Sequence, residues 1–236
     1  MPHTNDVIGR VFGFENEVFA NEAGLYGKLA HEGQAPKVLI ISCSDSRVVP
    51  EQIMQAKPGE LFVIRNAGNI VPPFAQQNGG VTATIEYAVA ALGVTDVVIC
   101  GHSGCGAMGA LVNPEGLDAL PSVKAWLKHS HAAKSVIDHS YPELDGQAAI
   151  RAASLENVVV QLQHLRTHPA VASRIAKGEL TLHGWFVDIH SGGILALDGE
   201  QGRFKPVRDG EELPVALSPA RRLAADFVET DDVLAA

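Results

Sequence analysis

Short apolar runs rich in β-branched residues alternate along the chain with longer stretches in which apolar residues recur at helical spacing. The runs have the length of strands, and the stretches between them are long enough for helical crossover connections. This alternation predicts an α/β fold with a mostly parallel central sheet flanked by helices. The predicted strands are 37–42, 61–65, 96–100 and 180–189, and the predicted helices are 50–54, 82–92, 107–112, 148–164 and 169–177.

The two ends of the chain depart from this alternation. Residues 8–30 carry apolar side chains at helical spacing, and we expect Gly24 and Gly27 to divide them into two helices. Such an arm can cover its own sheet or reach a neighbouring subunit. Residues 194–198 predict a hairpin partner that adds an antiparallel edge strand, and the strand pattern is lost beyond Gly199. We therefore expect a single domain with a helical arm at 1–35, a catalytic α/β core at 36–200 and a C-terminal extension at 201–236.

The composition limits the classes of partner. The net charge of −9 disfavours nucleic acid or an anionic membrane surface, because both are bound by clustered lysine and arginine. No apolar run approaches the roughly 18 residues of a membrane span, and acidic residues interrupt the only segment that resembles a secretory signal. The three cysteines fit a reducing compartment and indicate metal or thiol chemistry. These features predict a cytoplasmic protein whose partner is a small molecule or another protein.

The first predicted strand is followed by three reactive side chains, Cys43, Asp45 and Arg47. If the chain stayed extended, they would share one face beyond the carboxyl end of the strand, where open α/β sheets bind ligands. The same residues are also consistent with a small buried thiol and a surface ion pair of little energetic value. The pattern of these residues alone leaves both interpretations open.

The third predicted strand leads into a glycine-rich turn that contains His102 and Cys105. A helix begins just after Cys105, and its N-terminal dipole would favour the thiolate form of that residue. Together with Cys43 from the other strand end, two thiolates and an imidazole form a catalytic zinc set that leaves the fourth position free for water. Magnesium or calcium would require oxygen ligands instead. Cys100, inside the strand, is interpreted as a buried thiol.

Asp45 has two possible partners in such a site. Its carboxylate could bind the metal and close the fourth position, or it could pair with Arg47 through two charge-assisted hydrogen bonds. In the second case Asp45 is withdrawn from zinc and oriented to accept a proton from zinc-bound water. A metal with two thiolate ligands is formally neutral, so it lowers the pKa of its bound water less than a metal with neutral ligands does. A nearby hydrogen-bond acceptor for that water therefore matters more here.

Two motifs resemble those of the β-class carbonic anhydrases: Cys-Ser-Asp-Ser-Arg at 43–47 and His-Ser-Gly-Cys at 102–105. The likeness covers roughly residues 30–195. It implies one Zn²⁺ per subunit held by Cys43, His102 and Cys105, with Asp45 as a further ligand only in a closed form. It also implies that Asp45 and Arg47 form a catalytic dyad, and that zinc-hydroxide attack on carbon dioxide yields bicarbonate and a proton. Flanking matches are Pro-Gly-Glu at 58–60, Arg-Asn at 65–66, Ile-Glu-Tyr-Ala at 85–88 and His-Gly-Trp at 183–185.

The resemblance favours the constitutively open, plant-like subtype of the family. In the other subtype, bicarbonate at a separate site promotes the closed form through a Trp, an Arg and a Tyr. The corresponding positions here are Ile40, Arg65 and Val187, so only the arginine is kept.

The substrate pocket of the open subtype has counterparts in this chain. The resemblance places this pocket at a dimer interface, facing the zinc of the neighbouring subunit. It therefore implies a homodimer or a dimer of dimers that binds carbon dioxide and bicarbonate. The residues carried over are Gln34, Phe62, Tyr87 and Gly104.

Other functions use the same residue types. Some relatives of the family hydrolyse carbon disulfide or carbonyl sulfide on the same scaffold. A structural or zinc-sensing protein would have a permanently closed four-ligand site, which the presence of Asp45, Arg47 and the glycine-rich turns disfavours. A redox thiol protein would carry a Cys-x-x-Cys pair, and the sequence has none.

Overall fold

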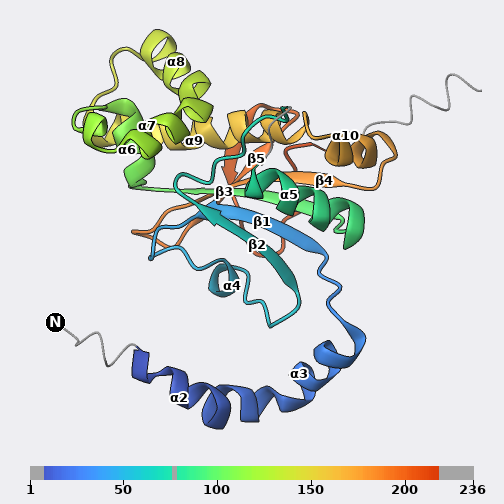
Figure 1. Cartoon of the computed structure of the whole chain (residues 1–236). Helices are drawn as coiled ribbons and strands as arrows, with labels where there is room; N and C mark the ends of the chain where they lie inside the picture. The colour runs from blue at the N-terminus through green and yellow to red at the C-terminus, as the bar shows by residue number, and fades with distance from the viewer. Residues whose placement is uncertain (1–7, 76–78, 218–236) are drawn as a thin grey trace, which may run out of the picture.

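The computed structural model describes residues 8–75 and 79–217, which are organised around a six-stranded sheet of order β2-β1-β3-β4-β5-β6 (Figure 1). The first four strands in this order are parallel, and β5 and β6 are antiparallel to their neighbours. The predicted fold class, including the hairpin formed by 194–198, is confirmed. The strands are β1 (Val38–Cys43), β2 (Leu61–Asn66), β3 (Asp96–His102), β4 (Thr181–Val187), β5 (Ile194–Asp198) and β6 (Arg203–Pro206).

The bounds of β1, β2 and β4 differ from the predicted ones by one or two residues at an end, and two further strands differ in ways that matter more. Strand β3 is longer than the predicted 96–100, so that His102 belongs to the strand itself. Strand β6 was not predicted, because its residues are at most half-buried and lack apolar alternation. It forms because β5 offers a free edge for antiparallel pairing. The C-terminal extension expected at 201–236 is thus in part a strand, and its residues 218–236 lie outside the described part.

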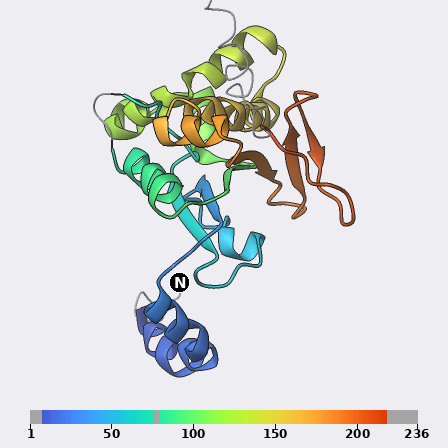
Figure 2. The same ribbon diagram turned by 90° about the vertical axis from the view of Figure 1, so that its right-hand side faces the viewer.

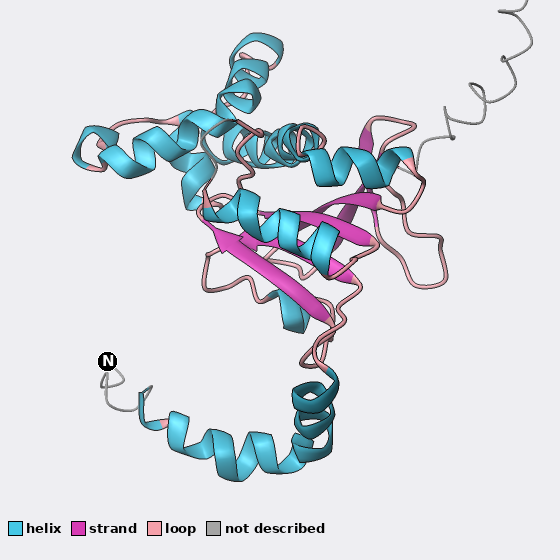
Figure 3. Cartoon of the chain, turned by 45° about the vertical axis from the view of Figure 1, so that its right-hand side comes forward, coloured by secondary structure: helices cyan, strands magenta, loops and turns pink. Residues whose placement is uncertain are grey.

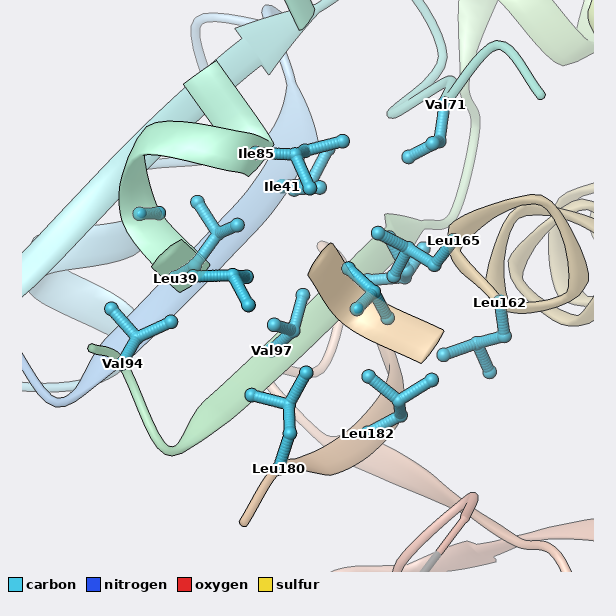
Figure 4. Close-up of a cluster of buried hydrophobic side chains, with 14 of the residues drawn as sticks. Leu39, Ile41, Val71, Ile85, Val94, Val97, Leu162, Leu165, Leu180 and Leu182 are labelled. Carbon is cyan, nitrogen blue, oxygen red and sulfur yellow. The ribbon is translucent and has the colours of Figure 1, made fainter. Parts of the chain in front are cut away.

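Helices cover both faces of the parallel strands, which explains their continuous apolar sequences. Leu39 and Ile41 are fully buried under α5, α9 and α10 (Figure 4). Ile40 belongs to a separate cluster on the side of α4. Each such side chain contributes about 1.5–3 kcal/mol through burial. None of the helices in the described ranges is long and apolar enough to cross a membrane. The helices of the core are α4 (Pro50–Ile53), α5 (Gly80–Glu86), α6 (Gly106–Val112), α7 (Pro121–Leu127), α8 (His131–Ser140), α9 (Gly146–Leu165) and α10 (Pro169–Ala176).

The N-terminal arm projects away from this core (Figures 2 and 3). It consists of α2 (Val11–Gly13), a π-helical segment (Phe14–Phe19) and α3 (Ala20–Glu32), and none of these residues is buried. The prediction that Gly24 and Gly27 break the helix is wrong, because α3 passes through both and the kink lies at Glu22. Glycine lowers helix stability by only about 1 kcal/mol, which does not by itself end a helix.

Candidate metal centre

The cluster of Cys43, His102 and Cys105 forms where two neighbouring parallel strands end. Cys43 is the last residue of β1 and His102 the last of β3, so both lie at the carboxyl edge of the sheet. Gly104 then adopts φ +62°, a left-handed conformation that glycine accepts without strain, and the turn places Cys105 at the N-cap of α6. One ligand atom from each of the three residues lies within 4.8 Å of the others. The structure therefore brings the three predicted ligands together.

The donor atoms of this cluster are buried and suit zinc. The two sulfurs are 4.0 Å apart, close to the roughly 3.8 Å expected for two thiolates at 2.3 Å from a tetrahedral zinc. His102 Nδ1 donates a hydrogen bond to the Ser103 carbonyl at 2.9 Å, which leaves Nε2 as the lone-pair nitrogen. This Nε2 is buried and has no hydrogen-bond partner among the described residues. A buried nitrogen without a partner is costly, and a metal ion would satisfy it.

The two thiols of the cluster shift each other's pKa. The hydrogen bond with Cys105 lowers the pKa of Cys43 to about 4, with smaller contributions from His102 and the Gly68 N–H group. The same hydrogen bond, with burial, raises the pKa of Cys105 and outweighs the amides at the start of α6. Burial raises the pKa of Cys100 to about 12. Cys100 is fully buried, as expected for a thiol of the core.

Asp45 and Arg47 form a bidentate ion pair beside the cluster. Arg47 Nε donates to Asp45 Oδ1 at 2.9 Å and Arg47 Nη2 donates to Asp45 Oδ2 at 2.7 Å. These bonds to Arg47 are the main reason that the pKa of Asp45 lies well below its usual value. Arg47 thus holds an ionised carboxylate beside the cluster, with Oδ2 4.0 Å from His102 Nε2.

The expectation that residues 43–47 continue as extended chain is wrong. Strand β1 ends at Cys43, and the backbone N–H of Arg47 donates to Asp45 Oδ1 at 3.0 Å. An aspartate that accepts the N–H group two residues ahead forms a local turn. This turn, rather than strand alternation, brings the carboxylate and the guanidinium together.

Arg65 has a role at this edge that its position in a flanking motif did not reveal. Its Nε donates to the Cys43 carbonyl at 3.1 Å, and its Nη2 donates to the Asp45 carbonyl at 2.8 Å. Arg65 stands opposite Ser42 in the pairing of β1 with β2. The sequence feature that could have indicated this role is the position of Arg65 at the end of a predicted strand. The side chain therefore fastens the backbone of the first motif.

The predicted pocket residues lie in two places. Gly104 is at the cluster, where its carbonyl accepts a hydrogen bond from Arg47 at 3.2 Å. Phe62 pairs with Leu39, four residues before the end of β1, which is roughly 13 Å away at about 3.3 Å per residue. Tyr87 follows α5 and is 51% exposed, with its ring centroid 6.0 Å from that of Phe62. Gln34 is exposed in the connection between α3 and β1.

Comparison with known proteins gives consistent matches. The family model described as carbonic anhydrase matches residues 38–194. A carbonic anhydrase of Pseudomonas aeruginosa is 50% identical over 208 residues, which cover 88% of this chain and 94% of the relative. Carbonic anhydrase 1 of Escherichia coli O157:H7 is 46% identical over 202 residues, covering 86% and 91% of the two chains.

The solved structures agree with these sequence matches. The β-carbonic anhydrase CcaA superposes with a TM-score of 0.86 and 42% identity, covering 93% of this chain and 97% of that one. A tetrameric β-carbonic anhydrase of Sordaria macrospora gives a TM-score of 0.68 and 31% identity, with coverages of 87% and 97%. The family match spans the strands and turns that carry Cys43, His102 and Cys105. This chain therefore belongs to the β-class carbonic anhydrases and is an enzyme of that family.

Proposed function

We propose that the enzyme catalyses the reversible hydration of carbon dioxide to bicarbonate and a proton, with one zinc ion held by Cys43, His102 and Cys105. The buried, unpartnered His102 Nε2 and the sulfur separation of 4.0 Å support zinc at this position. Sulfur and nitrogen donors together suit zinc better than magnesium or calcium. When bound, zinc supplies the Lewis acidity that makes water a nucleophile near neutral pH.

The observation that carries the catalytic proposal is the orientation of Asp45. Two hydrogen bonds from Arg47 and the local turn hold its carboxylate, and Oδ2 lies 4.0 Å from the ligand nitrogen of His102. In the proposed mechanism Oδ2 accepts a hydrogen bond from the attacking water and orients its lone pair toward carbon dioxide. Because Arg47 holds the pKa of Asp45 low, the carboxylate stores the released proton poorly. The proton therefore passes on to buffer.

The same ion pair supports an open, working form of the site. A carboxylate engaged by both guanidinium nitrogens of Arg47 is not free to take the fourth position on zinc. Ile40 and Val187, at the positions of the Trp and Tyr of the bicarbonate-switched subtype, offer no polar group to an effector. Arg65 is already engaged with two backbone carbonyls. We therefore assign the chain to the open subtype.

We further propose a dimer in which each zinc faces pocket residues of the other subunit. Gln34, Phe62 and Tyr87 lie toward the opposite end of the strands from the cluster of their own chain, and β2 is an edge strand. The arm carries large apolar side chains with no cover, including Phe12 at 78% exposure and Val11 at 64%. Such a surface marks an interface, and a second copy of the chain would cover it. The Sordaria macrospora relative is described as tetrameric, which is consistent with assembly.

The substitution Asp45→Asn tests the catalytic proposal. We expect zinc content to remain at one per subunit and kcat/KM for hydration to fall by about 100-fold, because the amide no longer presents an anionic acceptor. Zinc analysis and stopped-flow hydration rates give both values. The matched control is Asp118→Asn, which removes a carboxylate from an exposed ion pair with Lys124 and should leave the rate unchanged. An Asp45→Asn enzyme with full activity would refute the proposed dyad.

A further inference from the structure

The loop after β2 places a backbone amide on one of the proposed ligands. The N–H group of Gly68 donates to Cys43 Sγ at 3.4 Å. Gly68 has φ +79°, and a Cβ at this position would lie 3.1 Å from both Ala107 Cβ and Met108 Cε. A side chain at Gly68 would be strained at this φ, and the loop, Ala107 or Met108 would have to move by a few tenths of an ångström to accept it.

Side chains from other helices hold this loop in place. Asn157 Nδ2, on α9, donates to the Gly68 carbonyl at 2.9 Å. Gln161 Nε2, one turn further along α9, donates to Asn157 Oδ1 at 2.8 Å, and Gln161 Oε1 accepts the Val71 N–H at 2.9 Å. Trp126 Nε1, on α7, donates to the Ala67 carbonyl at 2.8 Å. The loop is thus tied to two helices on both sides of Gly68.

The two amides of α9 are exceptions on a buried helix face. Asn157 and Gln161 are completely buried, while neighbouring positions such as Ala153, Val158 and Leu165 are buried and apolar. An amide at a buried position is costly unless its donors and acceptors are satisfied. Here Asn157 Nδ2 donates to the loop, and Asn157 Oδ1 accepts from Gln161. Gln161 Nε2 also donates to the His129 carbonyl at 3.2 Å, so Asn157 is the member of the pair that contacts Gly68 itself.

We propose that Asn157 is a positioning residue of the metal centre, which holds Gly68 so that its N–H group donates to the Cys43 sulfur. The assignment rests on the zinc site proposed above. A hydrogen bond to a thiolate withdraws electron density from the sulfur, so Cys43 donates less charge to the metal. A metal with two thiolate ligands is formally neutral, and the bond from Gly68 restores part of its Lewis acidity.

The test is the substitution Asn157→Leu, which removes the donor but keeps a side chain of similar size. The matched control is Gln163→Leu, the same change from amide to leucine at an exposed position of α9. Zinc affinity is measured by competition with a chelator, and the cobalt-substituted proteins are compared by their thiolate-to-cobalt absorption. We expect Asn157→Leu to move the absorption to longer wavelength, because the Cys43 sulfur then donates more charge to cobalt. We also expect zinc binding to weaken by about 10-fold or more, because the loop no longer holds Cys43 in its ligand position. Gln163→Leu should change neither value.

A second variant covers the case in which Asn157→Leu does not fold. Trp126→Phe removes the bond to the Ala67 carbonyl from a half-buried position, and it should move the cobalt absorption in the same direction by a smaller amount. A folded Asn157→Leu or Trp126→Phe protein with unchanged absorption and zinc affinity would overturn the assignment. Wild-type protein that bound neither metal would overturn the proposed zinc site and this assignment with it, so the two failures are distinguishable.

Discussion

At the carboxyl ends of β1 and β3, the groups that shape the metal cluster are held by bonds within the chain, whereas the N-terminal arm buries none of its residues. Asp45 is bound by Arg47, the backbone at Cys43 and Asp45 by Arg65, and the loop over Cys43 by Asn157. In the arm, Phe14 and Phe19 contact mainly each other and Tyr26.

This difference matches the division of the active site between two subunits that we propose. The groups proposed to bind the metal and orient the water all lie in one chain, where hydrogen bonds hold them. Three of the groups proposed to line the substrate pocket, Gln34, Phe62 and Tyr87, lie toward the opposite end of the strands, near the arm and β2. Substitutions can separate the two regions, because some should affect the metal and others only the assembly.

The largest effect is expected for Cys43→Ser, at the carboxyl end of β1. A serine oxygen is a poor substitute for a thiolate, so zinc should be lost and hydration activity should fall by more than the 10- to 100-fold typical of changes around a metal site. Metal analysis and stopped-flow rates check both. The control is Cys100→Ala, which removes the thiol one strand away at a fully buried position and should retain zinc. Full zinc occupancy in Cys43→Ser would contradict the ligand assignment.

The cluster at the carboxyl ends of β1 and β3 was also the part of the molecule that the sequence predicted best. Cys43 and His102 follow β-branched runs, and the carboxyl ends of neighbouring parallel strands must meet, so the ligand cluster followed from pattern and chemistry alone. The turn at Asp45 did not follow, because alternation assumes an extended chain and a side-chain hydrogen bond to Arg47 overrides it. The alternation of apolar residues also gave no sign of Asn157, whose bond to Gly68 joins residues that are distant in sequence.

The arm was harder to predict for a different physical reason. Its apolar spacing predicted helices correctly, but a pattern of spacing does not reveal which surface covers the apolar face. The break predicted at Gly24 and Gly27 is wrong. A Cβ at either position would meet no described atom within 4 Å, so each glycine lowers helix stability only by its intrinsic propensity, and α3 tolerates this loss. For β6, the pairing with β5 decides the structure rather than the sequence of the strand itself. In each case the missing information is the neighbouring surface.

The double substitution Phe12→Glu and Val18→Glu places charges on side chains that are 78% and 52% exposed in the single chain. If a second copy covers them, we expect a monomer that retains zinc but loses about 100-fold in activity, because the pocket groups leave the partner's site together. Light scattering, metal analysis and hydration rates report the three quantities.

The control for the arm variant is Leu120→Glu, at a side chain that is 54% exposed and lies outside the arm. It should leave both assembly and activity unchanged. An arm variant that became monomeric and kept full activity would show that each chain holds a complete active site. An arm variant that remained a dimer would place the interface elsewhere.

The smallest effect is expected for a substitution in the substrate pocket. It also gives the sharpest test of whether the active site is shared between subunits. Gln34→Leu should lower kcat/KM by roughly 10- to 100-fold, since a hydrogen bond to a charged group is worth about 1.5–3 kcal/mol. Heterodimers of a Gln34→Leu subunit with a Cys43→Ser subunit can be purified through two different tags. Each heterodimer then contains one intact metal centre, in the Gln34→Leu subunit, and one intact Gln34, in the Cys43→Ser subunit. If each zinc faces Gln34 of the partner subunit, one of the two sites combines an intact metal centre with an intact pocket, and about half of wild-type activity returns. If zinc and Gln34 serve the same site within one chain, the heterodimer keeps only one slow site and has about half the activity of the Gln34→Leu dimer.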